Sequence, residues 1–222
     1  MILSIDSASV TASAALCKDG KIVKSEFMNN GLTHSETLLP MVKRVMQGYR
    51  FEQLEAIAVT AGPGSFTGVR IGVSAAKGIA FAYDIPCVSV SSLEATAYNF
   101  TDADCIICVC MDARRMQFYN AIFKSENGVI HRIIPDRAIS LDDLKKDVER
   151  YDGVVIAGDG ARLCFENIGL DNVTLAPQDK IYTNGEGVIK AAENKKRISA
   201  SSLMPVYLRL SQAERELKLK KQ

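Results

Sequence analysis

The sequence predicts an α/β protein of two tandem lobes, because landmarks of its first half return in the same order in its second half. Each landmark has a partner of the same kind, and the partners are 106, 108, 107 and 96 residues apart. We therefore place the lobes at residues 1–101 and 102–222. The landmark pairs are Asp6 and Asp112, the turns Asp19-Gly20 and Asn127-Gly128, the helix starts at Thr33 and Ser140, and the glycine turns at Gly62 and Gly158.

The first lobe is expected to follow the order β, β, β, α, β, α, with a mixed sheet. Apolar runs bounded by turn residues predict the strands, and Asp19-Gly20 is a strong hairpin signal. Thr33 to Glu36 reads as a capping box, and apolar residues follow it at helical spacing. The expected strands are 1–5, 11–17, 21–27 and 56–59; the helices start near Thr33 and near Ser65, and the second reaches Tyr83.

The second lobe repeats this order after a linker near residues 99–104. Apolar runs at 105–111, 117–123, 129–134 and 153–157 predict strands, and Ser140 begins a capped helix. Beyond Gly160 we expect a short helix, a strand at 173–176 and a helix near 186–193. The residues from Leu210 to Lys221 alternate in charge and predict a last helix that packs back on the core, and on the first lobe in particular.

The second helix of the first lobe has an unusually bare ridge. Gly68, Gly72, Ala76 and Ala80 recur every four residues, so another segment can approach this ridge closely. Either the helix lies in the core of its own chain, or the ridge meets a partner. The glycine turn before it matches neither standard phosphate fingerprint, so its glycines serve phosphate binding or a tight turn with close packing.

Composition excludes several classes of protein. A formal charge of +1 and a pI of 7.6 argue against strong nucleic-acid binding by this chain alone. The first segment reaches an acid at Asp6, and no run of 18 apolar residues exists, so we expect a cytoplasmic protein with no membrane contact. Cys105, Cys108 and Cys110 resemble a metal cluster, but we interpret the six cysteines as buried, reduced thiols.

The duplicated plan resembles the ribonuclease-H-like superfamily of actin, hexokinase and heat-shock chaperones. The stretch TAGPGSFTGVRIGVSAAKG and the segment Pro205–Arg209 are similar to the TsaB family, formerly YeaZ, of bacterial accessory subunits in tRNA threonylcarbamoyladenosine synthesis, which has been filed beside glycoproteases. The resemblance covers essentially the whole chain. It implies two lobes of the actin-like ATPase type.

The same resemblance supplies a test for a metal site. The catalytic relative carries a His-x-x-x-His pair that binds a divalent metal, and Ser92 and Thr96 stand at those positions here. Hydroxyl groups are poor replacements for imidazole toward zinc or iron. His34 and His131 are too far apart in sequence to replace the pair. We therefore expect neither metal ligands nor catalytic residues in this chain.

In the superfamily, acids at the ends of the first strands hold a nucleotide-bound metal. Asp6 and Asp112 occupy those positions, although an acid after a strand also caps turns. Asp112 is followed by Ala113-Arg114-Arg115, with no hydroxyl to match Ser7. We interpret the cleft as vestigial and expect no independent ATP hydrolysis. Its residues would be Asp6, Ser7, Gly62, Gly64 and Asp112.

The resemblance implies a non-catalytic subunit that activates a metal-bearing threonylcarbamoyltransferase. ATP or ADP and metal are expected at that partner, with no cofactor held tightly by this chain alone. An ATPase subunit would join the pair, tRNA would be contacted through the complex, and the chain alone could form a homodimer. The alternatives are an ATP-dependent metabolite kinase and a metallopeptidase-like enzyme. The predicted partner-binding residues are Leu38, Met41, Val42, Val45, Val69, Gly72, Val73 and Ala76.

Overall fold

A computed structural model describes residues 1–30 and 33–209, and it contains two five-stranded mixed sheets. The predicted α/β fold of two similar lobes is thereby confirmed. The strand orders are β3-β2-β1-β4-β5 and β10-β9-β6-β7-β8, so both lobes share one topology. The first sheet contains β1 (Ile2–Asp6), β2 (Ala12–Lys18), β3 (Lys21–Met28), β4 (Ala56–Gly62) and β5 (Cys87–Ser91). The second contains β6 (Cys105–Asp112), β7 (Gln117–Glu126), β8 (Val129–Ser140), β9 (Val154–Ala157) and β10 (Val173–Leu175).

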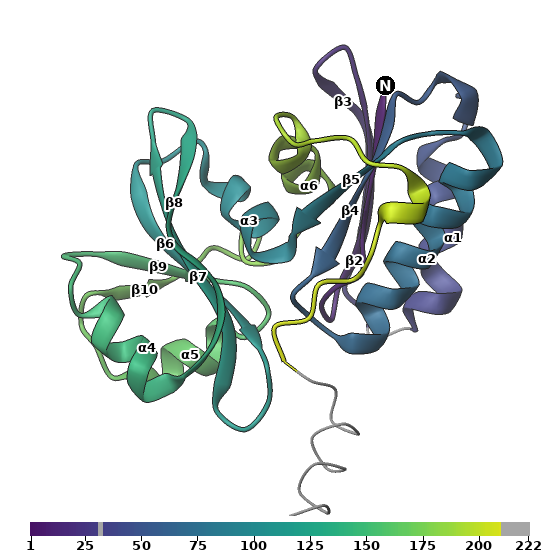
Figure 1. Cartoon of the computed structure of the whole chain (residues 1–222). Helices are drawn as coiled ribbons and strands as arrows, with labels where there is room; N and C mark the ends of the chain where they lie inside the picture. Colours follow the sequence, from purple (N-terminus) through teal and green to yellow (C-terminus); the bar gives the residue numbers. More distant parts are fainter. Residues whose placement is uncertain (31–32, 210–222) are drawn as a thin grey trace, which may run out of the picture.

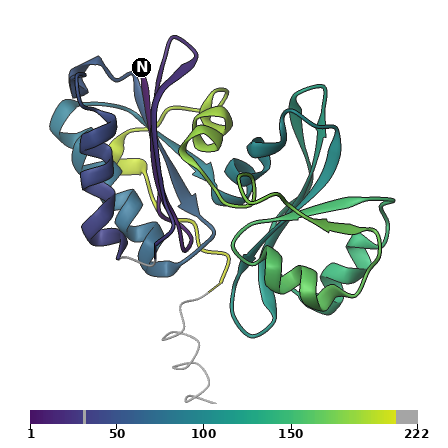
Figure 2. The same cartoon turned by 180° about the vertical axis from the view of Figure 1, so that it is seen from behind.

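The helices form an outer layer on each sheet and a shared layer between the sheets (Figures 1 and 2). α1 (His34–Val45) and α2 (Phe66–Tyr83) cover the first sheet, and α4 (Leu141–Val148) and α5 (Ala161–Ile168) cover the second. α3 (Ser92–Ala97) and α6 (Gly185–Ala192) pack on each other between the lobes. Short 3-10 turns lie at Phe51–Gln53, Tyr98–Phe100 and Ala200–Ser202. No helix within the described part of the chain has the length and hydropathy of a membrane span.

Two local predictions were wrong. The first lobe has a fifth strand, β5, which follows Pro86 and pairs in parallel with β4. The strand has only five residues and follows a long apolar helix, so its apolar run was not recognised as a separate element. Thr33 is the N-cap residue of α1, but its side chain accepts no hydrogen bond from the backbone, so the predicted capping box is not formed. Ser140, by contrast, accepts a hydrogen bond from Asp143 N as expected. The predicted helix at 210–221 lies outside the described residues.

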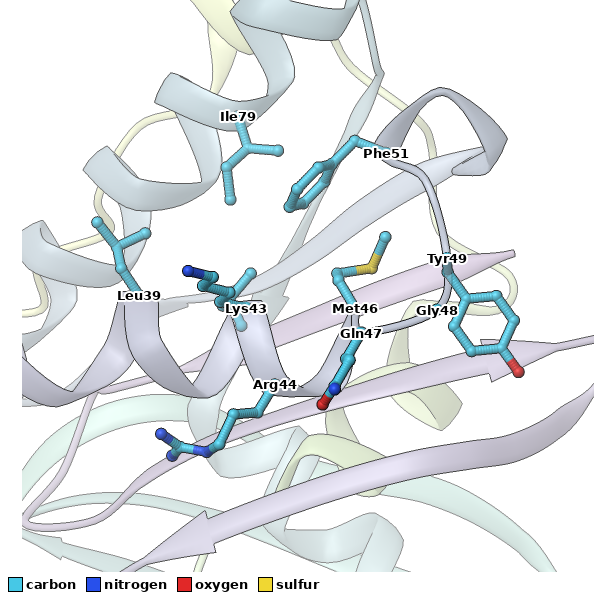
Figure 3. Close-up of a pocket in the computed structure, with 10 residues that line it drawn as sticks. Leu39, Lys43, Arg44, Met46, Gln47, Gly48, Tyr49, Phe51 and Ile79 are labelled. Carbon is cyan, nitrogen blue, oxygen red and sulfur yellow. The ribbon is translucent and has the colours of Figure 1, made fainter.

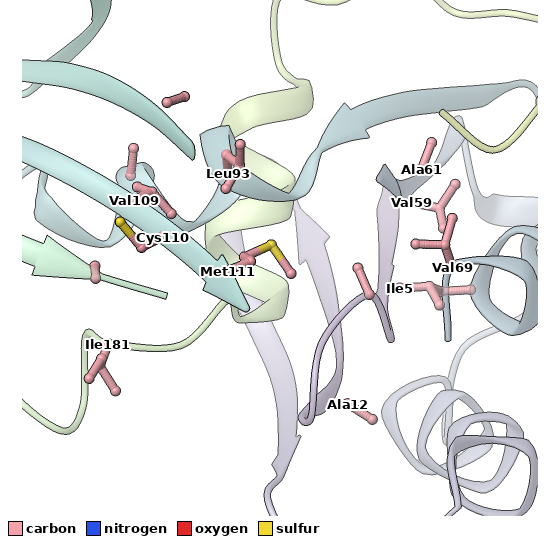
Figure 4. Close-up of a cluster of buried hydrophobic side chains, with 14 of the residues drawn as sticks. Ile5, Ala12, Val59, Ala61, Val69, Leu93, Val109, Cys110, Met111 and Ile181 are labelled. Atoms are coloured by element: carbon pink, nitrogen blue, oxygen red, sulfur yellow. The ribbon is translucent and has the colours of Figure 1, made fainter. Parts of the chain in front are cut away.

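The bare ridge of α2 faces its own sheet. A Cβ atom at Gly68 would lie 2.1 Å from the carbonyl oxygen of Ser7, and one at Gly72 would lie 2.7 Å from Ser7 Oγ. Ala76 and Ala80 are buried on the same ridge. Val69 lies beside Ile5 and Val59 in this core (Figure 4). The hypothesis that the ridge meets a partner is therefore corrected: glycine is needed because the β1–β2 loop occupies the space of a side chain.

After the second lobe the chain returns to the first. Ser4 Oγ donates a hydrogen bond of 2.7 Å to the carbonyl oxygen of Gly185, which seats α6 on the inner face of the first sheet. Ile198 forms a β-bridge with Cys87, and Val206 N donates to the carbonyl oxygen of Ala61 at 2.6 Å. The yellow segment in Figure 1 shows this path across the first lobe.

Candidate interlobe cleft and outer helix face

A cleft of about 440 Å³ lies where the lobes meet at the N-terminus of α2. Its walls come from the β1–β2 loop, the glycine turn, the β6–β7 turn and the C-terminal segment. Of the five residues predicted for a vestigial nucleotide cleft, Gly64 and Asp112 line it. Arg114, Tyr119, Asp159, Tyr207 and Arg209 also line it, and none of these was predicted.

Asp6 lies behind the cleft and is fully buried. Its Oδ1 accepts hydrogen bonds from Ala8 N and from the Thr60 hydroxyl, whereas no described residue is a partner for Oδ2. Burial raises the pKa of Asp6 to about 6, and the two hydrogen bonds and His34 oppose this rise only in part. The carboxylate therefore organises the turn that follows β1, and it does not face the open part of the cleft.

Asp159 is the cleft acid that the sequence analysis missed. Its Oδ1 accepts a hydrogen bond of 3.1 Å from Asp112 N, and the backbone N–H of Val10 also donates to it. Burial raises the pKa of Asp159 to about 6, and the nearby negative charges of Asp112 and Asp6 act in the same direction. Because Val10 belongs to the first lobe, Asp159 joins the two lobes. The repeat of Gly62–Gly64 as Gly158-Asp159-Gly160 was the sequence signal that could have located it.

The first-lobe loops that would hold a phosphate are filled by their own chain. Ser7 Oγ donates a hydrogen bond of 2.9 Å to the carbonyl oxygen of Gly68. A Cβ at Gly64 would lie 2.2 Å from the carbonyl oxygen of Ala8, and one at Gly62 would lie 2.3 Å from that of Val206. Ser7 and Gly62 thus serve packing and the tight turn. Carboxylates still line the cleft, but the Ser7 hydroxyl donates its hydrogen bond within the chain.

The positions that correspond to metal ligands lie on α3. Ser92 and Thr96 are fully buried, and Thr96 Oγ1 lies 2.7 Å from Thr183 Oγ1. Thr96 Oγ1 also donates to the carbonyl oxygen of Ser92 at 2.9 Å, as a threonine in a helix commonly does. Within residues 1–30 and 33–209, no group of three or more His, Cys, Asp or Glu side chains could hold a metal ion. All six cysteines are free thiols, and five of them are buried.

The predicted partner-binding residues are all buried in the first lobe, so the choice of helix face was wrong. The apolar stripe that the sequence shows is the stripe that packs on the sheet, as is usual for a surface helix. The residues concerned are Leu38, Met41, Val42, Val45, Val69, Gly72, Val73 and Ala76.

The opposite face of the same two helices carries two grooves whose exposed lining is mostly apolar. One groove of about 580 Å³ lies between Leu39, Ile79 and Phe51, from α1, α2 and the turn after α1 (Figure 3). A second groove of about 670 Å³ lies between the N-terminal halves of α1 and α2. Leu39 is 53% exposed and Phe81 is 62% exposed. Exposed apolar surface that continues over two grooves is typical of a protein interface.

Comparison with known proteins gives consistent relatives. Residues 30–157 match the family model "TsaD: tRNA N6-adenosine threonylcarbamoyltransferase". The chain is 32% identical to the tRNA threonylcarbamoyladenosine biosynthesis protein TsaB of Bacillus subtilis, with 96% of each chain covered. It is 27% identical to the protein of the same name from Escherichia coli, with 97% of each covered. A crystal structure of an uncharacterized protein with similarity to peptidase YEAZ from Pseudomonas aeruginosa superposes with a TM-score of 0.81 at 25% identity, covering 94% of this chain and 99% of that one.

Proposed function

This chain belongs to the TsaB family of tRNA threonylcarbamoyladenosine biosynthesis proteins, and on that premise we propose that it is a non-catalytic subunit of a tRNA-modifying complex. It binds and activates a metal-bearing threonylcarbamoyltransferase, which transfers the threonylcarbamoyl group to adenosine of tRNA. ATP or ADP and the metal belong to the partner. The match of residues 30–157 to the transferase model supports a common fold for the two subunits.

The observation that carries this proposal is the apolar outer face of α1 and α2. Leu39, Ile71 and Ile79 lie at the surface of this face, where they line its two grooves. Burying such a face against a partner removes apolar area from water at about 25 cal/mol per Å². The buried hydroxyls of Ser92 and Thr96 are poor metal ligands. This favours an accessory role for the chain beside a partner subunit that binds the metal.

The remaining partners follow from the same role. An ATPase subunit joins the assembled pair, tRNA is met only by the complex, and the complex works in the cytoplasm. When the transferase is absent, two copies of this chain can cover the α1–α2 face of each other. That homodimer would compete with the mixed dimer for one surface.

The test compares two exposed apolar residues of equal exposure. Leu39 on α1 and Val129 at the start of β8 are each 53% exposed, so aspartate at either position should leave the isolated chain folded. We expect Leu39→Asp to weaken binding of the transferase by a factor of about 30 or more, since a central contact can be worth 2 kcal/mol or more. Val129→Asp should bind normally. Equal affinity of the two variants, measured by calorimetric titration, would remove the α1–α2 face from the interface.

A further inference from the structure

Residues 203–209 form a strap that crosses the first lobe and reaches the second (Figure 1). The side chain of Leu203 is fully buried in the core, and its carbonyl oxygen accepts a hydrogen bond of 3.1 Å from Lys77 Nζ on α2. Further along, Val206 N donates a hydrogen bond to the carbonyl oxygen of Ala61 on β4. The strap is therefore attached both to a helix and to a sheet strand of the first lobe.

A ring stack holds the strap at the N-terminus of α2. The ring of Tyr207 stacks on that of Phe66, with 4.9 Å between the ring centroids. Arg70 Nε donates a hydrogen bond of 2.8 Å to the Tyr207 hydroxyl, and the guanidinium carbon of Arg70 lies 3.7 Å from the centroid of the Phe66 ring. Ring stacking and cation–π contacts are favourable even at exposed sites. Tyr207 is thus held by two residues of one helix, at a point where it lines the cleft.

Beyond this stack the strap contacts the second lobe. Arg209 Nη1 donates a hydrogen bond of 2.8 Å to the carbonyl oxygen of Ala113, which follows β6. Asp159 forms another bridge, because its carboxylate accepts hydrogen bonds from Val10 N of the first lobe and from Asp112 N of the second. All five residues line the cleft of about 440 Å³. Two separate contacts therefore join the lobes across this cleft.

The lobes have a further joint in the layer that they share. α3 packs against β4 and β5 of the first sheet and against β6 and β7 of the second, and α6 packs on α3. In Figure 1 these two helices lie between the lobes, above the end of the strap. Two domains of one chain commonly rotate about such a joint unless another contact prevents it. The strap and Asp159 supply contacts of this kind at the cleft.

We propose that residues 203–209 are a latch that holds the two lobes closed across the cleft without a bound ligand. In two-domain proteins that close around a ligand, the ligand supplies the contacts to both sides. Here one segment of the chain makes them, since Val206 and Tyr207 anchor it on the first lobe and Arg209 contacts the second. Because the latch is covalently part of the chain, it acts at a high effective concentration, and closure needs no small molecule.

Amide hydrogen exchange of the full chain, followed by NMR, tests the latch at Val10, whose N–H binds Asp159 across the cleft. Tyr207→Ala removes the ring stack, and Arg209→Ala removes the hydrogen bond to the second lobe. Because the two contacts act in series, we expect each variant to speed exchange of the Val10 N–H about tenfold, and the double variant to have no larger effect. The amides of β2 and β7 should exchange as in wild type, which separates opening of the lobes from unfolding.

The matched control is Met204→Ala, because Met204 lies on the same strap and is 62% exposed. It should leave exchange at Val10 unchanged. An unchanged rate in Arg209→Ala would overturn the inference, and if Tyr207→Ala also loosens β2, the result for Arg209→Ala alone decides. Additive effects of the two substitutions would contradict a latch, since they indicate two independent local contacts. Slower exchange at Val10 of the wild-type chain on addition of magnesium ATP would also overturn it, because closure would then require a ligand.

Discussion

The Thr60 hydroxyl on β4 donates a hydrogen bond of 2.6 Å to Asp6 Oδ1, and so joins two parallel strands at the last residue of β1. In the superfamily plan, the acid at this place holds a metal-bound nucleotide. Here its bonded oxygen is turned to its own sheet. Because this carboxylate is fully buried, we expect its protonation to affect the stability of the fold.

Stability should depend on the protonation of Asp6. Because its pKa rises from 3.8 to about 6 on folding, the folded state binds this proton more tightly than the unfolded state. The free energy of unfolding should therefore fall as pH rises from about 4 to about 6, by about 3 kcal/mol for this group, and then stay level. Asp6→Asn should be more stable than wild type at pH 7.5, because it buries no charge. We expect a gain of about 1–2 kcal/mol and not the full value of about 3 kcal/mol, because the amide group of the asparagine lacks one hydrogen-bond partner.

Urea unfolding at pH 4.5 and 7.5 checks this expectation. Asp102→Asn serves as a control without pH dependence in this window: a hydrogen bond from Lys180 lowers the pKa of Asp102 from 3.8, so the carboxylate stays ionised at both pH values in the folded and the unfolded state. A carboxylate whose pKa is lowered contributes stability above its unfolded pKa, and this is lost as pH falls. If Asp6→Asn were less stable than wild type at both pH values, the charge of Asp6 would be compensated in the folded state.

Two glycines of α2 should respond oppositely to alanine. A Cβ at Gly68 would meet the carbonyl oxygen of Ser7 at 2.1 Å, whereas one at Gly78 would have no neighbour within 4 Å. We expect Gly68→Ala to cost about 2 kcal/mol or more, as overpacking does. Gly78→Ala should stabilise the chain by about 0.5–1 kcal/mol through helix propensity. Thermal melting of both variants measures this, and similar melting temperatures would contradict the close approach of the β1–β2 loop.

The cleft carboxylates should have little influence on tRNA modification. Asp6→Asn and Asp112→Asn should each reduce the rate of the reconstituted complex by less than about threefold, because neither residue would touch reacting atoms in the partner. Assembly is measured alongside the rate. Abolished modification by an intact complex would show that the cleft has a chemical role.

The purified chain should carry no stoichiometric transition metal and should cleave no peptides. The expectation rests on Ser92 and Thr96, whose neutral hydroxyls are weak ligands for zinc or iron. Elemental analysis of the protein, with Ser92→Ala and Thr96→Ala beside it, provides the measurement. The expectation would be contradicted if the wild-type chain held about one metal ion and either variant had lost it.

Much of the fold was predictable because the lobes repeat one order of signals. Asp19-Gly20 and Asn127-Gly128 both form hairpin turns, and each repeated acid ends its strand. The site was less predictable, because a buried stripe and a binding stripe have the same composition. Val42 lies in the core and Leu39 at the surface, and only their packing separates them. Asp159 was missed because its partner, Val10, is distant in sequence.

The second lobe lies in the sequence between two parts of the first. α6 and the segment from Ile198 to Val206 complete the first sheet and its inner face, yet the ribosome makes them after the whole of the second lobe. The first sheet has its last strand at Ser91, and α6 ends at Ala192, so during synthesis its inner face stays uncovered while about 100 further residues are made. The second sheet is contiguous in sequence and can form earlier. We therefore expect the order of folding to be opposite to the order of synthesis. The second lobe should reach its final structure before the first.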